Sequence, residues 1–138
     1  MSKRKKIKTP TLNKSKNLKA ITPPNYNNMP IIFSLEKLAE DEYCFSKLNS
    51  ENKKQFAESI FKRRHLTWNE IQRTGRHALG TEKMPRTQIK GTIPSFITPD
   101  VSEFLVFRFN GKKSMVGLRE KNIFYVIWFD STFTLYKH

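Results

Sequence analysis

The nine residues NIFYVIWFD at 122–130 constrain the fold more than any other stretch of this chain. Every residue between the first and the last is apolar or aromatic. The run is far shorter than the roughly 20 residues that a membrane helix needs. It also lacks the alternation of apolar and polar residues that marks a strand with one solvent-exposed face. Continuous apolar runs of this length are typical of strands covered on both faces. We therefore expect an internal strand at 122–130.

The flanking segments predict further strands around this one. EFLVFRF at 103–109 precedes Asn110-Gly111, and this dipeptide between apolar runs is the strongest short-range hairpin signal. KKSMVGLR at 112–119 forms the return strand, and TFTLYKH at 132–138 is expected to be a final strand. The last third of the chain is thus predicted to form three to four antiparallel strands.

Two helices are predicted in the middle of the chain. The segment 51–64 places Phe56, Ala57, Ile60 and Phe61 at helical spacing, with Ser50 as its N-cap. A second, short helix is expected to begin at Trp68, because Thr67 and Glu70 stand at the spacing of a capping box. Gly75 is placed to end that helix in the left-handed conformation.

The remaining segments complete an α+β chain. PIIFSLEKL at 30–38 is expected to be a strand that runs into a turn or short helix, and DEYCFSKL at 41–48 a second extended piece. We expect 75–86 to be a loop and 87–102 an irregular connector interrupted by prolines. The order is one strand, two helices and an antiparallel sheet, which favours helices packed on one face of the sheet.

The charge distribution divides the chain and indicates a polyanionic partner. The net charge is +14, and residues 1–20 carry eight of the cations and no acid, which leaves +6 for the rest. We expect a disordered basic tail at 1–29 and one domain at 30–138. Nucleic acid is the expected partner, since the tail has no apolar face for a membrane. The cations expected to bind it are Lys3, Arg4, Lys5, Lys6, Lys8, Arg76, Arg86 and Lys112.

Several functional classes are disfavoured by the composition. The single cysteine, Cys44, cannot form an internal disulfide, and the three separated histidines offer no paired ligands for zinc. We therefore expect neither a metal nor a cofactor. The basic N-terminus lacks the apolar stretch of a signal peptide, so a cytoplasmic protein is expected.

The segment GRHALGTEKMPR at 75–86 contains the residue types that acid–base chemistry requires. His77 and Glu82 can move protons, and neighbouring Arg and Lys residues can stabilise negative charge. The spacing matches no phosphate-cradling motif. The competing interpretation is a basic surface loop in which Glu82 pairs with a neighbour.

The hairpin and the last residues supply further candidates. A two-residue Asn110-Gly111 turn would place Arg108 opposite Lys113, on one face with Val106 and Met115, and Arg119 would extend that face. Two opposed cations repel, so a phosphate between them would explain the pair. Alternatively, both side chains extend into solvent at the hairpin tip. The final strand would bring Tyr136 and His138 to the rim of the sheet.

The segment VFRFNGKKSMVGLREKNIFYVIWFDSTFTLYKH at 106–138 resembles the C-terminal half of RelE/HigB-like toxins, which are mRNA interferases. The resemblance extends to the order of elements over 30–138, and the ending is similar to that of small uncharacterised bacterial and phage proteins. It implies metal-independent cleavage of RNA by attack of the ribose 2′-OH on the adjacent phosphate. It also implies RNA, possibly on the ribosome, and a small acidic antitoxin as partners. The matching catalytic positions are Arg108, Lys113, Arg119, Tyr136 and His138, to which the loop adds His77 and Glu82.

Two other functions remain open. A non-catalytic module could bind RNA or DNA through counterion release by the tail and stacking on aromatic side chains. A small phage or bacterial factor could instead bind an acidic protein.

Overall fold

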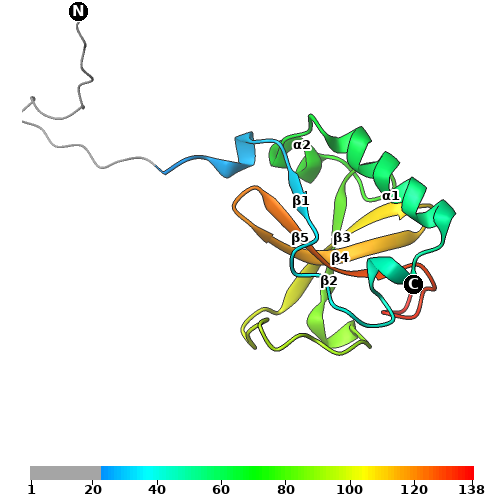
Figure 1. Ribbon diagram of the computed structural model, residues 1–138. Helices are drawn as coiled ribbons and strands as arrows, with labels where there is room; N and C mark the ends of the chain where they lie inside the picture. Colours follow the sequence, from blue (N-terminus) through cyan, green and yellow to red (C-terminus); the bar gives the residue numbers. More distant parts are fainter. Residues whose placement is uncertain (1–22) are drawn as a thin grey trace, which may run out of the picture.

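The computed structural model describes residues 23–138, and its architecture is α+β, as the sequence predicts (Figure 1). The five-stranded sheet has the order β1-β5-β4-β3-β2; β1 runs parallel to β5 and the other neighbours are antiparallel. The sheet is therefore mixed and larger than the expected three to four antiparallel strands. Its elements are α1 (Ser50–Arg63), α2 (Trp68–Arg73), β1 (Ile32–Ser34), β2 (Thr81–Pro85), β3 (Glu103–Asn110), β4 (Lys113–Glu120) and β5 (Ile123–Asp130).

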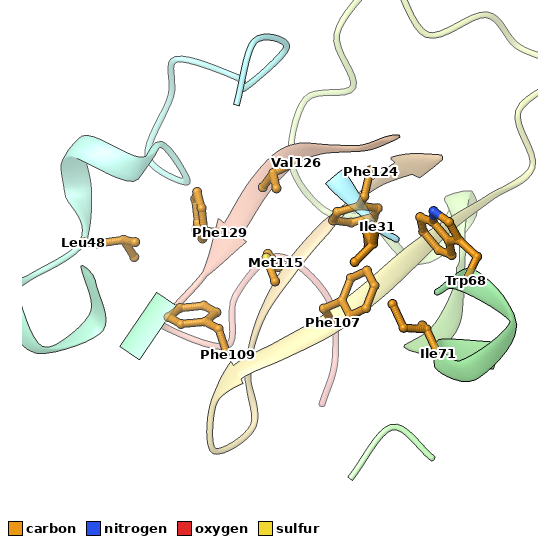
Figure 2. Packing of buried hydrophobic residues seen from close by; sticks show 10 residues of the cluster. All are labelled: Ile31, Leu48, Trp68, Ile71, Phe107, Phe109, Met115, Phe124, Val126 and Phe129. Carbon is orange, nitrogen blue, oxygen red and sulfur yellow. The ribbon is translucent and has the colours of Figure 1, made fainter. Parts of the chain in front are cut away.

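Strand β5 is internal and covered on both faces, which confirms the interpretation of the apolar run. Its Val126 and Phe129 belong to a helix-side core, whereas Ile127 and Trp128 belong to a connector-side core. The helix-side core comprises Ile31, Leu48, Trp68, Ile71, Phe107, Phe109, Met115, Phe124, Val126 and Phe129 (Figure 2). The connector-side core comprises Tyr43, Met84, Ile97, Phe104, Val106, Val116, Ile127, Trp128, Leu135 and Tyr136.

The helices begin near the predicted residues, with differences at their ends. Asn49, rather than Ser50, caps α1, because the Asn49 side chain accepts a hydrogen bond from the Asn52 amide at 2.8 Å. The capping box of Thr67 and Glu70 at the start of α2 is confirmed in both directions. Gly75 does not take the left-handed conformation, so that prediction is wrong; α2 ends at an extended Thr74.

Three extended or irregular segments differ from expectation. Strand β2 lies within 75–86, which was expected to be a loop, and pairs with β3 along the edge of the sheet. The segment 41–48 is not extended and contains the 3-10 turn Phe45–Lys47. Residues 132–138 form no strand; the chain instead turns back after β5. Residues 89–102 are irregular as predicted, whereas residues 87 and 88 belong to the 3-10 turn Arg86–Gln88.

The folded part begins before residue 30. Tyr26–Asn28 forms a 3-10 turn, and the Asn28 side-chain oxygen accepts a hydrogen bond from the side-chain amide of Asn69 at 2.6 Å. Of the tail expected at 1–29, residues 23–29 are thus ordered against the domain. Residues 1–22, with Lys3, Arg4, Lys5, Lys6 and Lys8, lie outside the described residues. No helix within 23–138 has the length and apolar character of a membrane span.

The capping box gives a first testable prediction. Thr67→Ala should lower the free energy of unfolding by about 1 kcal/mol, because it removes the hydroxyl that accepts from the Glu70 amide. Urea denaturation measures the change. Thr92→Ala, at an exposed position in the connector, serves as the control and should leave the midpoint unchanged. An equal loss in both variants would contradict the role of the cap.

Candidate functional site

The candidate site lies on the connector side of the sheet, near the β3–β4 hairpin. Arg108 is directly paired with Ser114, and Ser114 with Asp130. Residues directly opposite one another in antiparallel strands project to the same face. Glu82 of β2 is paired with Val106, a member of the connector-side core, so its side chain is on this face too. The register therefore brings three charged residues from three strands to one region.

The loop between α2 and β2 adds a histidine and a cation to this region. His77 Nδ1 lies 3.0 Å from Arg108 Nη1, and Arg76 Nη1 lies 3.1 Å from Glu82 Oε1. The loop is tight: a Cβ at Gly80 would lie 1.7 Å from the Thr74 carbonyl oxygen, so only glycine fits there. The 75–86 segment, expected to be a loop, thus brings His77 to Arg108, a strand cation on the connector side.

Two arginines lie beside the ring nitrogens of His77. Arg76 and Arg108 can only donate hydrogen bonds, and a neutral imidazole has one accepting nitrogen. The contact with Arg108 is the shorter, at 3.0 Å against 3.4 Å for Arg76 Nε to His77 Nε2. The neutral ring therefore accepts through Nδ1 from Arg108 or through Nε2 from Arg76, according to its tautomer, and Arg108 makes the closer approach. The Arg76–Glu82 contact is an ion pair without hydrogen-bond geometry, since Glu82 Oε1 has no hydrogen-bond partner.

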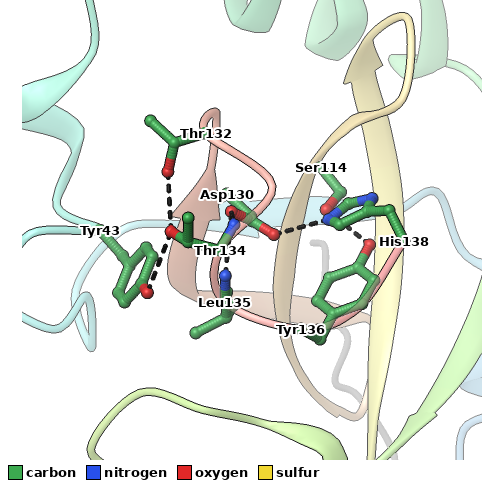
Figure 3. Close-up of polar contacts among 8 residues, drawn as sticks. All are labelled: Tyr43, Ser114, Asp130, Thr132, Thr134, Leu135, Tyr136 and His138. Atoms are coloured by element: carbon green, nitrogen blue, oxygen red, sulfur yellow. Dashed lines mark hydrogen bonds and ion pairs between the residues drawn. The ribbon is translucent and has the colours of Figure 1, made fainter.

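Asp130 fixes the chain that follows β5 (Figure 3). Its carboxylate is fully buried, and Oδ1 accepts hydrogen bonds from the amides of Thr134 at 3.0 Å and Leu135 at 3.2 Å. The other oxygen, Oδ2, lies 2.7 Å from Nε2 of His138. The side chain of His138 keeps 17% of its surface exposed. Asp130 thereby turns the last residues back over the sheet and orients the imidazole.

Tyr136 lies beneath His138 and is only 4% exposed. Its hydroxyl is 2.9 Å from Ser114 Oγ, and its ring stacks on the His138 ring with centroids 4.1 Å apart. Burial raises the pKa of the Tyr136 hydroxyl, the hydrogen bond with Ser114 opposes this, and the charges of Glu82 and Asp130 add to the rise. Tyr136 is therefore neutral near pH 7 and supports His138.

The raised pKa of Tyr136 makes stability depend on pH in alkaline solution. In the unfolded chain a tyrosine ionises near pH 10, whereas the folded protein holds the proton to higher pH. The stabilisation is complete below the unfolded pKa and is lost as pH rises through the folded pKa. Tyr136→Phe should flatten the fall of unfolding free energy above pH 10, measured by urea denaturation. Tyr125→Phe controls for the loss of one phenol, and equal pH profiles for all three proteins would refute the prediction.

Lys113 and Arg119 do not join Arg108, which corrects the sequence-based site. Lys113 extends toward α1, with Nζ 3.4 Å from Asn52 Oδ1. Arg119 is at the far end of β4, its guanidinium 4.2 Å from the Trp68 ring, and it donates to Asn27. Burial lowers the pKa of Arg119. Both cations lie on the helix side of the sheet, as does Met115 of the helix-side core.

The register of the hairpin explains this error. The turn residues are Gly111 and Lys112, not Asn110 and Gly111, because Asn110 pairs with Lys113. Gly111 has a φ of 59°, a value that favours glycine. The register shifts between Arg108 and Asn110, which leaves Phe109 as an extra residue. Arg108 therefore faces Ser114, and the side chains of β4 lie on the opposite faces from those expected.

The cations predicted to bind nucleic acid have different positions. Arg76 pairs with Glu82, and Lys112 is exposed at the hairpin turn. Arg86 Nη1 donates to the carbonyls of Thr98 and Val101, at 2.6 Å and 3.0 Å, so it holds the connector in place. Within residues 23–138, no group of three or more His, Cys, Asp or Glu side chains is arranged to hold a metal ion.

Arg63 is a residue of the site that sequence reasoning missed. It is 1% exposed and donates to the carbonyls of Leu79 at 2.9 Å, Ser59 at 3.1 Å and Arg108 at 3.1 Å. Burial lowers its pKa to about 10, so it remains a cation at neutral pH. Arg63 thus joins α1, the 75–80 loop and β3. In the sequence it is one of three consecutive cations near a helix end, with no sign that it alone is buried.

An open cleft of about 210 Å³ begins at the His77–Arg108 contact. It lies between α1, the loop and the hairpin tip, and we name it the α1 cleft. Its charged lining residues are Glu58, Lys62, Arg63, His77 and Arg108. The cleft and the connector-side cluster thus share His77 and Arg108.

Comparisons of the chain with protein-family models, with curated proteins and with solved structures found no match. What the protein does is therefore inferred from the geometry and the chemistry of the site.

Proposed function

We propose that the protein is a metal-independent endoribonuclease that cleaves RNA by attack of a ribose 2′-OH on the adjacent phosphate. One observation carries the proposal. Arg108, Ser114 and Asp130 lie opposite one another on three neighbouring strands. His77 contacts the first of them and His138 the last, so a His–Arg pair and a His–Asp pair occupy the same region of the sheet. The reaction needs a base, a cation for the phosphorane and an acid for the leaving oxygen. The resemblance to RelE/HigB-like toxins favours the same reaction.

Arg108 and His77 would act on the phosphate and the 2′-OH. A phosphate that binds Arg108 would compete with His77 for the guanidinium donors, because His77 Nδ1 lies 3.0 Å from Arg108 Nη1. Release from Arg108 makes Nδ1 available to take the proton of the 2′-OH. As the oxygen–phosphorus bond forms, negative charge grows on the phosphorane oxygens, and Arg108 stabilises it.

His138 would supply the proton that the leaving 5′-oxygen requires. Its Nε2 is engaged by Asp130 at 2.7 Å, which leaves Nδ1 for the substrate. The imidazolium gives the Nδ1 proton to the 5′-oxygen as the phosphorus–oxygen bond breaks, and a 2′,3′-cyclic phosphate remains. Asp130 and Tyr136 are positioning residues in this account, because both are buried beneath His138. Glu82 sets the position of Arg76 beside His77.

A non-catalytic RNA-binding module is the second candidate. Phe96 is 52% exposed and Lys37 Nζ lies 5.7 Å from its ring, a combination that suits stacking of a base beside a cation. The nuclease proposal accounts for more of the site, because binding alone requires neither the buried Asp130 nor its pairing with His138. The nuclease would work where RNA is, in the cytoplasm, under control of a small acidic partner.

The purified protein tests the proposal directly. End-labelled single-stranded RNA should be cut in excess chelator, with or without added ribosomes, and its all-deoxy analogue should stay intact. Retained binding with no cleavage in either condition would reject the nuclease and favour the binding module. For variants that remove a cation of the site, Lys54→Ala at an exposed position of α1 is the control for a general loss of positive charge.

A further inference from the structure

Arg63 is a buried cation without a carboxylate partner. None of the ion pairs among residues 23–138 involves Arg63, and its three hydrogen bonds all go to backbone carbonyls. Each guanidinium nitrogen makes one of these bonds, and the group also lies over the Phe107 ring, 4.9 Å from its centroid, so its contacts are carbonyl dipoles and an aromatic face and include no formal negative charge. Buried charges in proteins are normally paired, because an unpaired charge loses its hydration without compensation. The structure holds a positive charge that an anion could balance.

The α1 cleft gives an anion access to this charge. Arg63 lines the cleft together with Lys62 of the same helix and with His77 and Arg108. The only acid among the lining residues is Glu58, which is exposed. Lys62 is exposed too, and no ion pair within 23–138 involves it. The excess of cations around the cleft favours a negatively charged ligand.

We propose that the α1 cleft binds the phosphate next to the scissile phosphate in the same RNA strand. This inference rests on the proposed function, because the cleft begins at His77 and Arg108, where the scissile phosphate would lie. A strand bound at Arg108 places its neighbouring phosphate one nucleotide away, and the α1 cleft is the adjoining opening with cations. Arg63 supplies a buried positive charge in the lining of the cleft, and Lys62 supplies an exposed ammonium.

The site has a specific consequence for substrate length. A dinucleotide with one internal phosphate would occupy Arg108 and leave the cleft empty, whereas a trinucleotide could fill both. The added phosphate lowers KM, because it contacts Lys62 outside the reacting atoms. We expect Lys62→Ala to raise KM for trinucleotides and to leave kcat and dinucleotide cleavage unchanged.

The test uses the full chain and a trinucleotide of deoxyribose, which binds without being cut. Lys62→Ala should weaken its binding several-fold and reduce the slope of log affinity against log salt by about one. Lys54→Ala, an exposed lysine of the same helix outside the cleft, should have a smaller effect. Arg63→Gln, if folded by circular dichroism, should weaken binding further. NMR should show amide shifts for Leu79 and Gly111 with the trinucleotide, and weaker ones with inorganic phosphate.

The outcomes separate this proposal from the nuclease itself. Equal affinity losses for Lys62→Ala and Lys54→Ala, or no shifts at Leu79 and Gly111, would overturn the phosphate site even if RNA is cleaved. Larger shifts with inorganic phosphate than with the trinucleotide would also overturn it, in favour of a free-anion site. Binding that depends on Lys62, in a protein that never cuts RNA, would support the site and reject the nuclease.

Discussion

Arg108→Ala is expected to lower kcat/KM for RNA cleavage by roughly 100- to 1,000-fold, the loss typical of one donor to a charged transition state. Arg108 is the cation paired with Ser114 on the connector side and 3.0 Å from His77. Its removal takes away the group that balances the phosphorane. It also leaves His77 Nδ1 without the donor that orients it, so kcat should fall more than KM rises.

Two further variants make this expectation specific. Arg108→Lys keeps the charge but loses the planar donor fork, and should recover only part of the activity. Lys113→Ala should retain nearly full activity, because Lys113 extends toward Asn52 on the other side of the sheet. Loss of activity in Lys113→Ala with full activity in Arg108→Ala would reverse the assignment. Circular dichroism of each variant shows whether the fold is retained.

Asp130→Ala should have the largest effect on stability, a loss of about 3–5 kcal/mol of unfolding free energy. The substitution leaves the buried amide of Leu135 without an acceptor and frees the amide of Thr134 and the ring of His138. Urea denaturation measures the loss. Glu120→Ala, an exposed acid at the end of β4, is the control and should change stability little. A loss below about 1 kcal/mol in Asp130→Ala would mean that the carboxylate does not hold the last residues.

Asp130→Asn separates the structural role from the positioning role. The amide oxygen can still accept from the two backbone amides, so most of the stability should remain. The amide nitrogen donates and cannot accept a hydrogen bond from His138 Nε2–H, so the doubly protonated imidazolium that gives up the proton should be disfavoured. RNA cleavage should therefore fall in a variant that still folds. Full activity of folded Asp130→Asn would remove His138 and Asp130 from the mechanism.

The elements with strong local signals could be predicted from the sequence. The apolar run at β5 requires cover on both faces, and the capping box fixes the start of α2 at Trp68. These features depend on residues close together in the chain. Strand β2 could not be recognised, because Met84 is its only buried residue and its hydrogen bonds go to β3, about 20 residues later. The return of 132–138 depends on Asp130, whose acceptor role is a tertiary property.

The candidate site, too, could be predicted in its residue types but not in its tertiary contacts. The residue types of His77, Glu82, Arg108 and His138 indicated acid–base chemistry beside a cation. The cations that lie on the same face as these residues could not be predicted. The extra residue Phe109 shifts the register of β3 and β4, and strict alternation of side chains along an ideal strand does not anticipate it. Arg63 was hidden for another reason: a helix-end arginine is usually solvated, and its burial follows from the packing of α1 on β3.

The most direct test is cleavage of a deoxyribose oligonucleotide that contains a single ribonucleotide. We expect one cut, after the ribonucleotide, in excess chelator, with a 2′,3′-cyclic phosphate identified by mass spectrometry of the upstream fragment. The cut should be lost in Arg108→Ala. Cleavage at deoxyribose positions, a product with a plain 3′-hydroxyl end, or an intact oligonucleotide beside cut RNA would each contradict attack by the 2′-OH.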